Sequence, residues 1–150
     1  MQRIQTVMNK ELVARESIII NASADAIWEV LTNPEQIKKY LFGTETITDW
    51  HVGSTILFQG SYDGHDYKDK GNVLVNEPKT LLQYDYWSGF SGLPDSPENY
   101  SIVTYQIDRE YDTCSNFTWG QEGFSSETGQ QHAQGGLMGM LEQIKQIAEA

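Results

Sequence analysis

Tyrosines at alternate positions in the middle of the chain are the residues best suited to a chemical role. Tyr84, Tyr86 and Tyr105 fall on positions that strand alternation turns toward a core. A buried tyrosine hydroxyl needs a hydrogen-bond partner, so three of them on one face indicate a partly polar cavity. The same face carries three more aromatic residues and an amide: Phe58, Phe117, Trp119 and Gln121. The alternative is an ordinary core that these rings fill by themselves.

Metal binding finds little support. The segment Asp66–Gly71 followed by Glu77 has the acid, glycine and glutamate positions of a calcium loop, but Lys68 and Lys70 stand where oxygen ligands are needed. No cysteine or histidine lies at zinc-ligand spacing from any of the three histidines, His51, His65 and His132. We therefore expect no metal and no cofactor, and interpret the segment as a charged hairpin with Gly71 at the start of a strand.

Catalytic signatures are equally weak. Cys114 lies between Thr113 and Ser115 in a strand-like segment, which favours an inert cysteine over a nucleophile. The sequence has no G-x-S-x-G elbow. Carboxylates are so numerous that no pair stands out as an acid and base couple. We assign no catalytic residue, and an enzyme is the less favoured interpretation.

The elements before the tyrosines are predicted from residue type and spacing. Residues 12–21 end in three isoleucines, whose β-branching favours a strand. Ser23 is a good N-cap for a helix whose apolar residues are spaced three and four apart. Asn33 followed by Pro34 predicts the start of a second short helix.

In the remainder of the chain the spacing of apolar residues changes twice. Between residues 44 and 121 apolar residues recur at every second position, as in antiparallel strands with one buried face. Residues 88–99 form a loop rich in Gly, Pro and Ser, and we expect it to act as a flap over a cavity. Residues 126–150 are predicted to be a long amphipathic helix.

The simplest fold with this order is α+β. We expect a curved antiparallel sheet of about six to seven strands around the long C-terminal helix, with two short helices after the first strand. The length of 150 residues predicts one domain, residues 1–150. Residues 1–11 are expected to be a flexible or loosely packed N-terminal segment.

Glycines in the last helix leave two interpretations open. Gly135, Gly136 and Gly139 lie within its apolar stripe. Small residues there would let the helix approach the sheet closely. Alternatively, they would leave open volume between helix and sheet, where a ligand could lie.

The charge of the chain narrows its partners. Ten Lys and Arg against 21 Asp and Glu give a formal net charge of −11, which disfavours binding to nucleic acid and to anionic membranes. No stretch approaches the roughly 20 apolar residues of a membrane span. The start of the chain lacks the apolar region of a signal peptide. A single cysteine excludes an internal disulfide, so we expect a cytoplasmic protein.

Several short motifs, in this order, resemble one known superfamily. The longest runs from Ile18 through Asn21 and Trp28 to Glu35. The others follow along the chain: Asp49–Gly53, Asp69–Gly71, Glu77-Pro78, Tyr86–Ser88, Gly92–Tyr100 and Leu141–Lys145. The chain resembles the START-like (SRPBCC) superfamily, in the branch similar to the C-terminal domain of the activator of heat-shock-protein-90 ATPase.

This resemblance implies a helix-grip (START-like) fold with a cavity between the sheet and the long helix. Members of the superfamily bind lipids, sterols or polyketides, a few are cyclases or hydrolases, and others assist a chaperone. The chaperone activator has an additional N-terminal domain, for which 150 residues leave no room. The resemblance therefore favours the cavity as the functional feature.

The expected function is non-catalytic binding of a small hydrophobic or aromatic molecule in that cavity. The alternatives are a cyclase or hydrolase, and a protein-interaction module that assists a chaperone or forms a homodimer. An acidic face supports the interaction module, since residues 85–127 hold eight acids and one base, Arg109. The expected ligand-binding residues are Phe58, Tyr84, Tyr86, Tyr105, Trp119, Gln121, Leu137, Met138 and Leu141.

Overall fold

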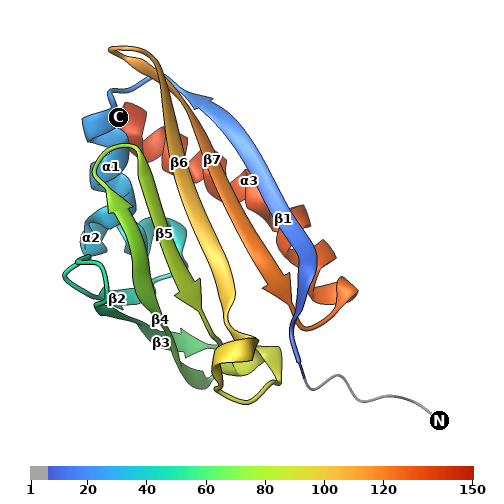
Figure 1. Ribbon diagram of the computed structural model, residues 1–150. Helices are drawn as coiled ribbons and strands as arrows, with labels where there is room; N and C mark the ends of the chain where they lie inside the picture. Colours follow the sequence, from blue (N-terminus) through green and yellow to red (C-terminus); the bar gives the residue numbers. More distant parts are fainter. Residues whose placement is uncertain (1–6) are drawn as a thin grey trace.

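A curved antiparallel sheet forms one layer of the molecule and three α-helices form the other (Figure 1). The computed structural model describes residues 7–150. Its seven strands are β1 (Asn9–Ile20), β2 (Glu45–Ile47), β3 (Thr55–Tyr62), β4 (His65–Glu77), β5 (Leu81–Tyr86), β6 (Ser101–Tyr111) and β7 (Cys114–Phe124). They are ordered β1-β7-β6-β5-β4-β3-β2, and each neighbouring pair is antiparallel. The expected α+β helix-grip architecture is confirmed.

The two short helices begin where their capping residues predict. In α1 (Ala24–Thr32) the Ser23 side chain accepts a hydrogen bond of 3.1 Å from the backbone N–H of Ala26. In α2 (Pro34–Tyr40) the Asn33 side chain accepts one of 3.0 Å from the N–H of Glu35. Proline at the first position of α2 has no N–H that would go unpaired there.

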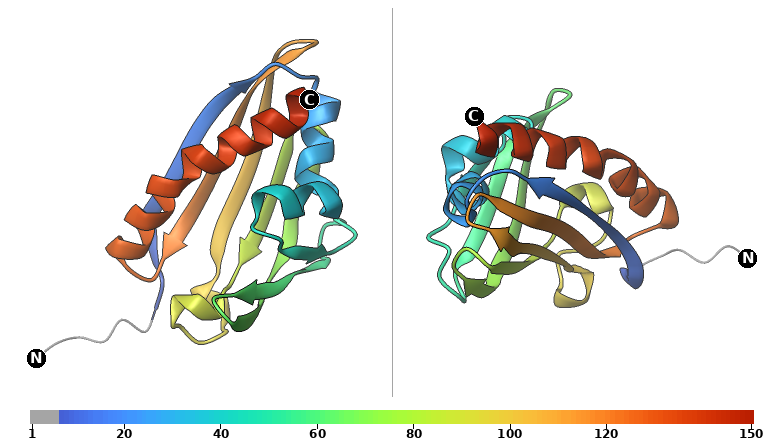
Figure 2. Two further views of the ribbon diagram at one scale, coloured as in Figure 1. Left: turned by 180° about the vertical axis from the view of Figure 1, so that it is seen from behind. Right: turned by 90° about the horizontal axis from the view of Figure 1, so that it is seen from above.

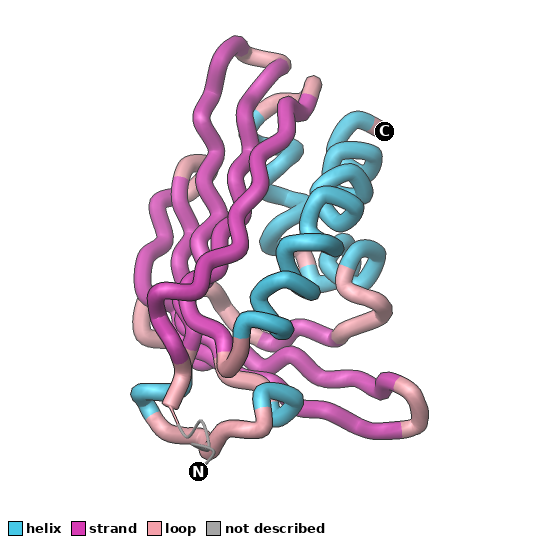
Figure 3. The backbone as a smooth tube through the Cα atoms, turned by 90° about the vertical axis from the view of Figure 1, so that its right-hand side faces the viewer, coloured by secondary structure: helices cyan, strands magenta, loops and turns pink. Residues whose placement is uncertain are grey.

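The long helix α3 (Glu127–Glu149) lies diagonally across one face of the sheet, beside α1 and α2 (Figure 2). Seen from the side, all three helices occupy the same face (Figure 3). Leu137, Leu141 and Ile144 of α3 are buried against the sheet. Because they recur at three- and four-residue intervals, they form the single apolar stripe that the sequence predicts.

Buried and exposed side chains alternate along the strands, and this alternation determines which side chains face the helices. Phe58, Tyr84, Tyr105, Phe117 and Trp119 are each less than 9% exposed and belong to one hydrophobic cluster. The pattern weakens at the end of β4, where the pairing with β5 shifts register between Val73 and Val75. Val73 is buried, whereas Val75 is only half-buried.

The strands differ from expectation at both ends of the predicted pattern. β1 begins at Asn9, so the last residues of the expected loose segment are part of the sheet, and Met8 is buried. Residues 1–6 of that segment lie outside the described residues. Gly71 lies inside β4 rather than at the start of a strand.

The loop of residues 88–99 is packed onto the sheet. It contains two short 3-10 helices, η1 (Gly89–Ser91) and η2 (Pro97–Asn99). The Asn99 side chain is buried, accepts a hydrogen bond from the Met8 N–H at 3.0 Å and donates one to the Pro94 carbonyl at 3.1 Å. The Trp87 indole N–H donates to the Leu93 carbonyl. These bonds fix the second half of the loop, which limits a flap to its first turn.

Two observations bear on other classes of function. Within residues 7–150, none of the helices is both long enough and apolar enough to cross a membrane. The same part of the chain gathers no set of three or more His, Cys, Asp or Glu side chains in metal-binding geometry.

Candidate ligand-binding cavity

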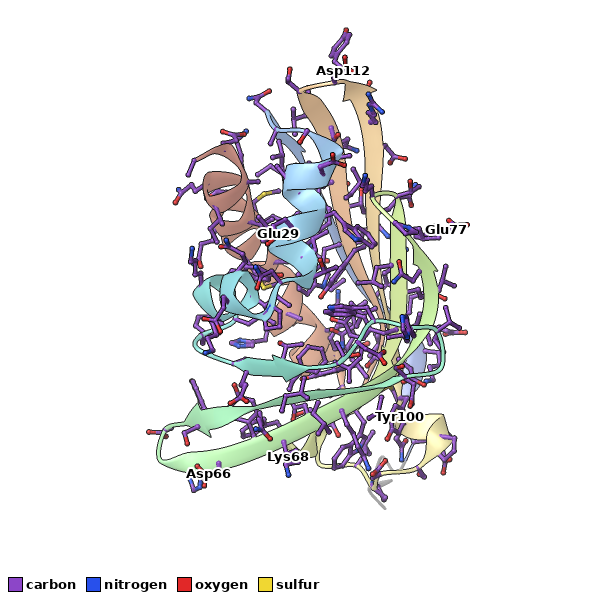
Figure 4. The ribbon with its side chains drawn as sticks, turned by 90° about the vertical axis from the view of Figure 1, so that its left-hand side faces the viewer. Glu29, Asp66, Lys68, Glu77, Tyr100 and Asp112 are labelled. Carbon is purple, nitrogen blue, oxygen red and sulfur yellow. The ribbon has the colours of Figure 1, made fainter. Side chains whose placement is uncertain are left out.

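A cavity of about 430 Å³ opens between the sheet, the loop after α2 and the first turns of α3. It lies near the β3–β4 hairpin, where Figure 4 shows Asp66 and Lys68, and at the opposite end of the molecule from Asp112. Most of its wall is aromatic. The lining residues are Leu41, Phe42, Thr44, Phe58, Ser61, Tyr62, Tyr67, Asp69, Tyr84, Tyr86, Phe90, Val103, Trp119, Gln121 and His132.

One glycine determines how two strands meet beneath the cavity. A Cβ atom on Gly71 would lie 1.9 Å from the carbonyl oxygen of Asp85, so only glycine permits this approach of β4 to β5. Next to it, the backbones of Lys70 and Trp87 exchange hydrogen bonds of 3.0 and 2.8 Å. This pairing extends contact between the two strands and brings Asp69 of β4 to the tyrosine at the end of β5.

Asp69 and Tyr86 form the polar centre of the wall. The Tyr86 hydroxyl donates to Asp69 Oδ2 at 2.5 Å, while Asp69 Oδ1 is buried without a hydrogen-bond partner. Only 6% of Asp69 is exposed. Burial raises the pKa of this carboxyl, against the opposing effect of the Tyr86 and Ser88 hydroxyls. Burial and the neighbouring carboxylate together raise the pKa of Tyr86, which therefore stays a donor.

The deep side of the cavity is closed by two tyrosines that share a hydrogen bond. The hydroxyls of Tyr84 and Tyr105 share a hydrogen bond of 2.6 Å, and their rings meet edge to face at 5.5 Å between centroids. The Trp119 ring lies 4.3 Å from that of Tyr105. Burial raises the pKa of both tyrosines. Both hydroxyls are thus protonated and already paired.

The mouth carries aromatic rings that face solvent. Phe42 is 88% exposed, Tyr62 66% and Phe90 63%. Phe90, from η1, contacts the rings of Tyr62 and Tyr67 at 6.4 and 5.9 Å between centroids. Gly60 leaves room for Tyr67, because a Cβ atom there would lie 2.8 Å from its hydroxyl oxygen. The first turn of the predicted flap thus borders the opening.

The structure brings together five of the nine expected ligand-binding residues. Tyr105 stands behind Tyr84 and does not line the cavity. The amide nitrogen of Gln121 is engaged, since it donates to the Ser101 hydroxyl at 3.1 Å. The five that line the wall are Phe58, Tyr84, Tyr86, Trp119 and Gln121.

The three residues of α3 that were expected to form part of the cavity wall lie elsewhere in the structure. Leu137 and Leu141 are buried in the hydrophobic core, and Met138 packs against it, so none of the three borders the cavity. The glycine interpretations are also wrong. A Cβ atom at Gly135, Gly136 or Gly139 would meet nothing within 4 Å, and these positions are exposed. They neither bring the helix to the sheet nor shape the cavity, and from α3 only His132 reaches it.

Asp69 and the aromatic residues at the mouth are cavity-lining residues that the sequence analysis does not identify. Asp69 has a sequence signal, because counting back in twos from Val73 through Gly71 places it on the inward face with Tyr67. Its charged neighbours favour a solvated hairpin instead, and that interpretation of residues 66–71 conceals the site. Phe42 and Phe90 lie outside regular strands, where no period identifies them.

A sheet that grips a long helix and encloses an aromatic cavity defines a helix-grip protein of the START-like class. Residues 21–149 match the family model described as activator of Hsp90 ATPase homolog 1-like protein. The chain belongs to this family.

Solved structures agree with this assignment. A protein of Cytophaga hutchinsonii is 37% identical, with a TM-score of 0.79 over 95% of this chain and 97% of that one. An HSP90 activator from Plasmodium falciparum is 12% identical, with a TM-score of 0.70 over 91% and 95% of the two chains. The Aha1 dimer from Colwellia psychrerythraea is 17% identical, with a TM-score of 0.70 over 91% and 96%. The last two show the fold alone. A search of curated proteins gives no match.

Proposed function

We propose that the cavity binds a small hydrophobic or aromatic molecule without transforming it. The observation that carries this proposal is an open, mainly aromatic space of about 430 Å³, within the usual range of ligand pockets. A closed core would fill such a volume with side chains, because protein interiors are close-packed. Aromatic rings make up most of the wall, which favours an apolar ligand that one or two of the polar side chains hold by hydrogen bonds.

Native mass spectrometry of protein purified gently from its host tests this function. We expect an extra mass that is lost on denaturation, and weaker retention in a Val103→Phe variant, whose larger side chain occupies the wall. Val75→Phe is the matched control, because Val75 lies outside the cavity wall. A bare wild-type mass, together with no binding of any of three aromatic probes (naphthylmethanol, naphthylmethylamine and naphthoate), would contradict the proposal.

A second candidate is an enzyme of the cyclase or hydrolase kind, and Asp69 is the observation that favours it. A carboxyl of raised pKa in a cavity wall is suited to transfer a proton. In that case, Asp69→Asn should retain an untransformed molecule whose covalent structure, compared by fragmentation, differs from that of the molecule bound to the wild type. Identical molecules in the two proteins would support binding alone.

Association with a protein partner is the proposal that family membership favours. Relatives include a protein described as an HSP90 activator and another described as an Aha1 dimer. A chaperone partner or a homodimer would find exposed rings at the mouth, on Phe42, Tyr62 and Phe90. Light scattering distinguishes one copy from two, and pull-downs at low and moderate salt test steering by the acidic surface. A cytoplasmic location remains part of this proposal.

A further inference from the structure

The least satisfied group of the cavity wall is an acid. Asp69 is only 6% exposed, and its Oδ1 has no hydrogen-bond partner. The Ser88 hydroxyl acts on the pKa of Asp69, but the hydrogen bond that it makes is with the Phe90 N–H. A buried acceptor without a partner destabilises the fold, and a charged one does so more than a neutral one. Such a group is retained most readily where a bound molecule completes its hydrogen bonds.

The rest of the wall has no positive side chain that could complete it. Among the described residues that line the cavity, none is Lys or Arg. The nearby Lys70 pairs with Asp95 and lies 5.9 Å from the centre of the Trp87 ring, so its charge is directed elsewhere. The other titratable groups of the wall are His132 and the tyrosines, of which Tyr86 already donates to Asp69.

The rings around the carboxylate are also suited to a cation. Phe58 lies 5.8 Å from both Tyr84 and Tyr86 between ring centroids, and Trp119, Tyr67 and Phe90 complete the wall. The face of an aromatic ring carries partial negative charge and attracts ammonium groups, especially where water is excluded. A carboxylate among such rings is the common arrangement for holding an organic cation.

We propose that the ligand is an organic ammonium ion, with its apolar body among the rings and its charge against Asp69. This inference rests on the proposed binding function and specifies the class of molecule. An alcohol or phenol would supply a donor but leave the buried charge uncompensated. A carboxylate ligand would add a second negative charge to a chain of net charge −11 and is excluded.

Three probes with one aromatic body separate these cases: naphthylmethylamine, naphthylmethanol and naphthoate. Calorimetric titration of the full chain near neutral pH should show the amine binding roughly tenfold more tightly than the alcohol, and naphthoate most weakly. Asp69→Asn should abolish the advantage of the amine, so that the amine and the alcohol bind within about twofold of each other. Asp69→Glu, which keeps the charge, should retain a preference for the amine.

Asp112→Asn is the matched control, because it removes the same charge from an exposed turn at the far end of the molecule (Figure 4). The inference is overturned if the alcohol binds as tightly as the amine, or if Asp112→Asn reduces the preference as much as Asp69→Asn. It then fails while the binding function stands. If none of the three probes binds, the binding function itself has failed. Where Asp69→Asn does not fold, the wild-type ratio and Asp69→Glu still decide.

Discussion

Two groups of tyrosines on the same face of the sheet differ in their surroundings and in their hydrogen-bond partners. Tyr84 and Tyr105 bond to one another, are covered by Trp119 and belong to the core. Tyr86 and Tyr67 lie nearer the β3–β4 hairpin and border the cavity, and Tyr84 is the residue where the core and the cavity meet. The difference lies in their partners. The hydroxyls of Tyr84 and Tyr105 share one hydrogen bond within the core, whereas the Tyr86 hydroxyl bonds to a half-satisfied carboxylate and leaves a place for a further group.

The largest change in stability is expected when one aromatic ring is removed from the core, and the comparison is removal of one ring from the mouth of the cavity. Phe117 is completely buried against Tyr105, so Phe117→Ala should lower the free energy of unfolding by about 3–5 kcal/mol. Phe90→Ala, at the mouth, should change it by less than about 0.5 kcal/mol. Urea denaturation measures both. If the mouth variant is destabilised as strongly as the core variant, the open region is a core after all.

A finer test removes one hydroxyl. Tyr105→Phe leaves the Tyr84 hydroxyl buried without its partner and should cost about 1–3 kcal/mol of unfolding free energy. The matched change Tyr62→Phe, on an exposed ring, should cost almost nothing. A Tyr105→Phe protein as stable as the wild type would mean that water or another group already satisfies Tyr84.

Removing the charge of Asp69 should stabilise the protein. Its pKa is raised in the fold by burial, so its contribution to stability is present below the unfolded pKa and is lost as the pH rises through the folded pKa. At a pH that ionises it, the buried carboxylate therefore opposes folding. Asp69→Asn should raise the free energy of unfolding by about 1 kcal/mol, and this gain should shrink as the medium is acidified.

Denaturation curves at several pH values measure that gain. Asp112→Asn serves again as the control, because its carboxylate is exposed and pairs only with Arg109 at the surface. A loss of stability in Asp69→Asn near neutral pH would mean that the carboxylate is structural. A gain combined with loss of amine binding would show the exchange of stability for function that is common at binding sites.

Local rules predict most of this fold. The caps at Ser23 and Asn33 and the alternation of the strands depend on near neighbours in sequence, so they can be inferred from residue types. The side of α3 that borders the cavity depends on how the helix crosses the sheet. That angle comes from packing, so the sequence alone does not predict that Leu137 and Leu141 lie in the core while His132 lines the cavity.

The mouth escapes sequence analysis for a different reason. Asp69 obeys the alternation, but a carboxylate at an inward position contradicts the usual burial of apolar residues, and only the approach of β5 at Gly71 gives it a partner. Phe42 lies after α2 with a φ of 53°. Nothing in the local sequence Leu41-Phe42-Gly43 predicts that the phenylalanine, as well as the glycine, adopts a left-handed conformation.

The smallest effect concerns that strained residue. At an ordinary position glycine is less stable than alanine, because its unfolded chain has more freedom. A left-handed conformation reverses the order, since alanine retains the steric cost that glycine avoids. Phe42→Gly should therefore be more stable than Phe42→Ala, by about 0.5 kcal/mol in urea denaturation. The opposite order would mean that Phe42 is free to relax. The expected order would mean that the strained turn after α2 destabilises the fold while it holds an exposed ring at the mouth of the cavity.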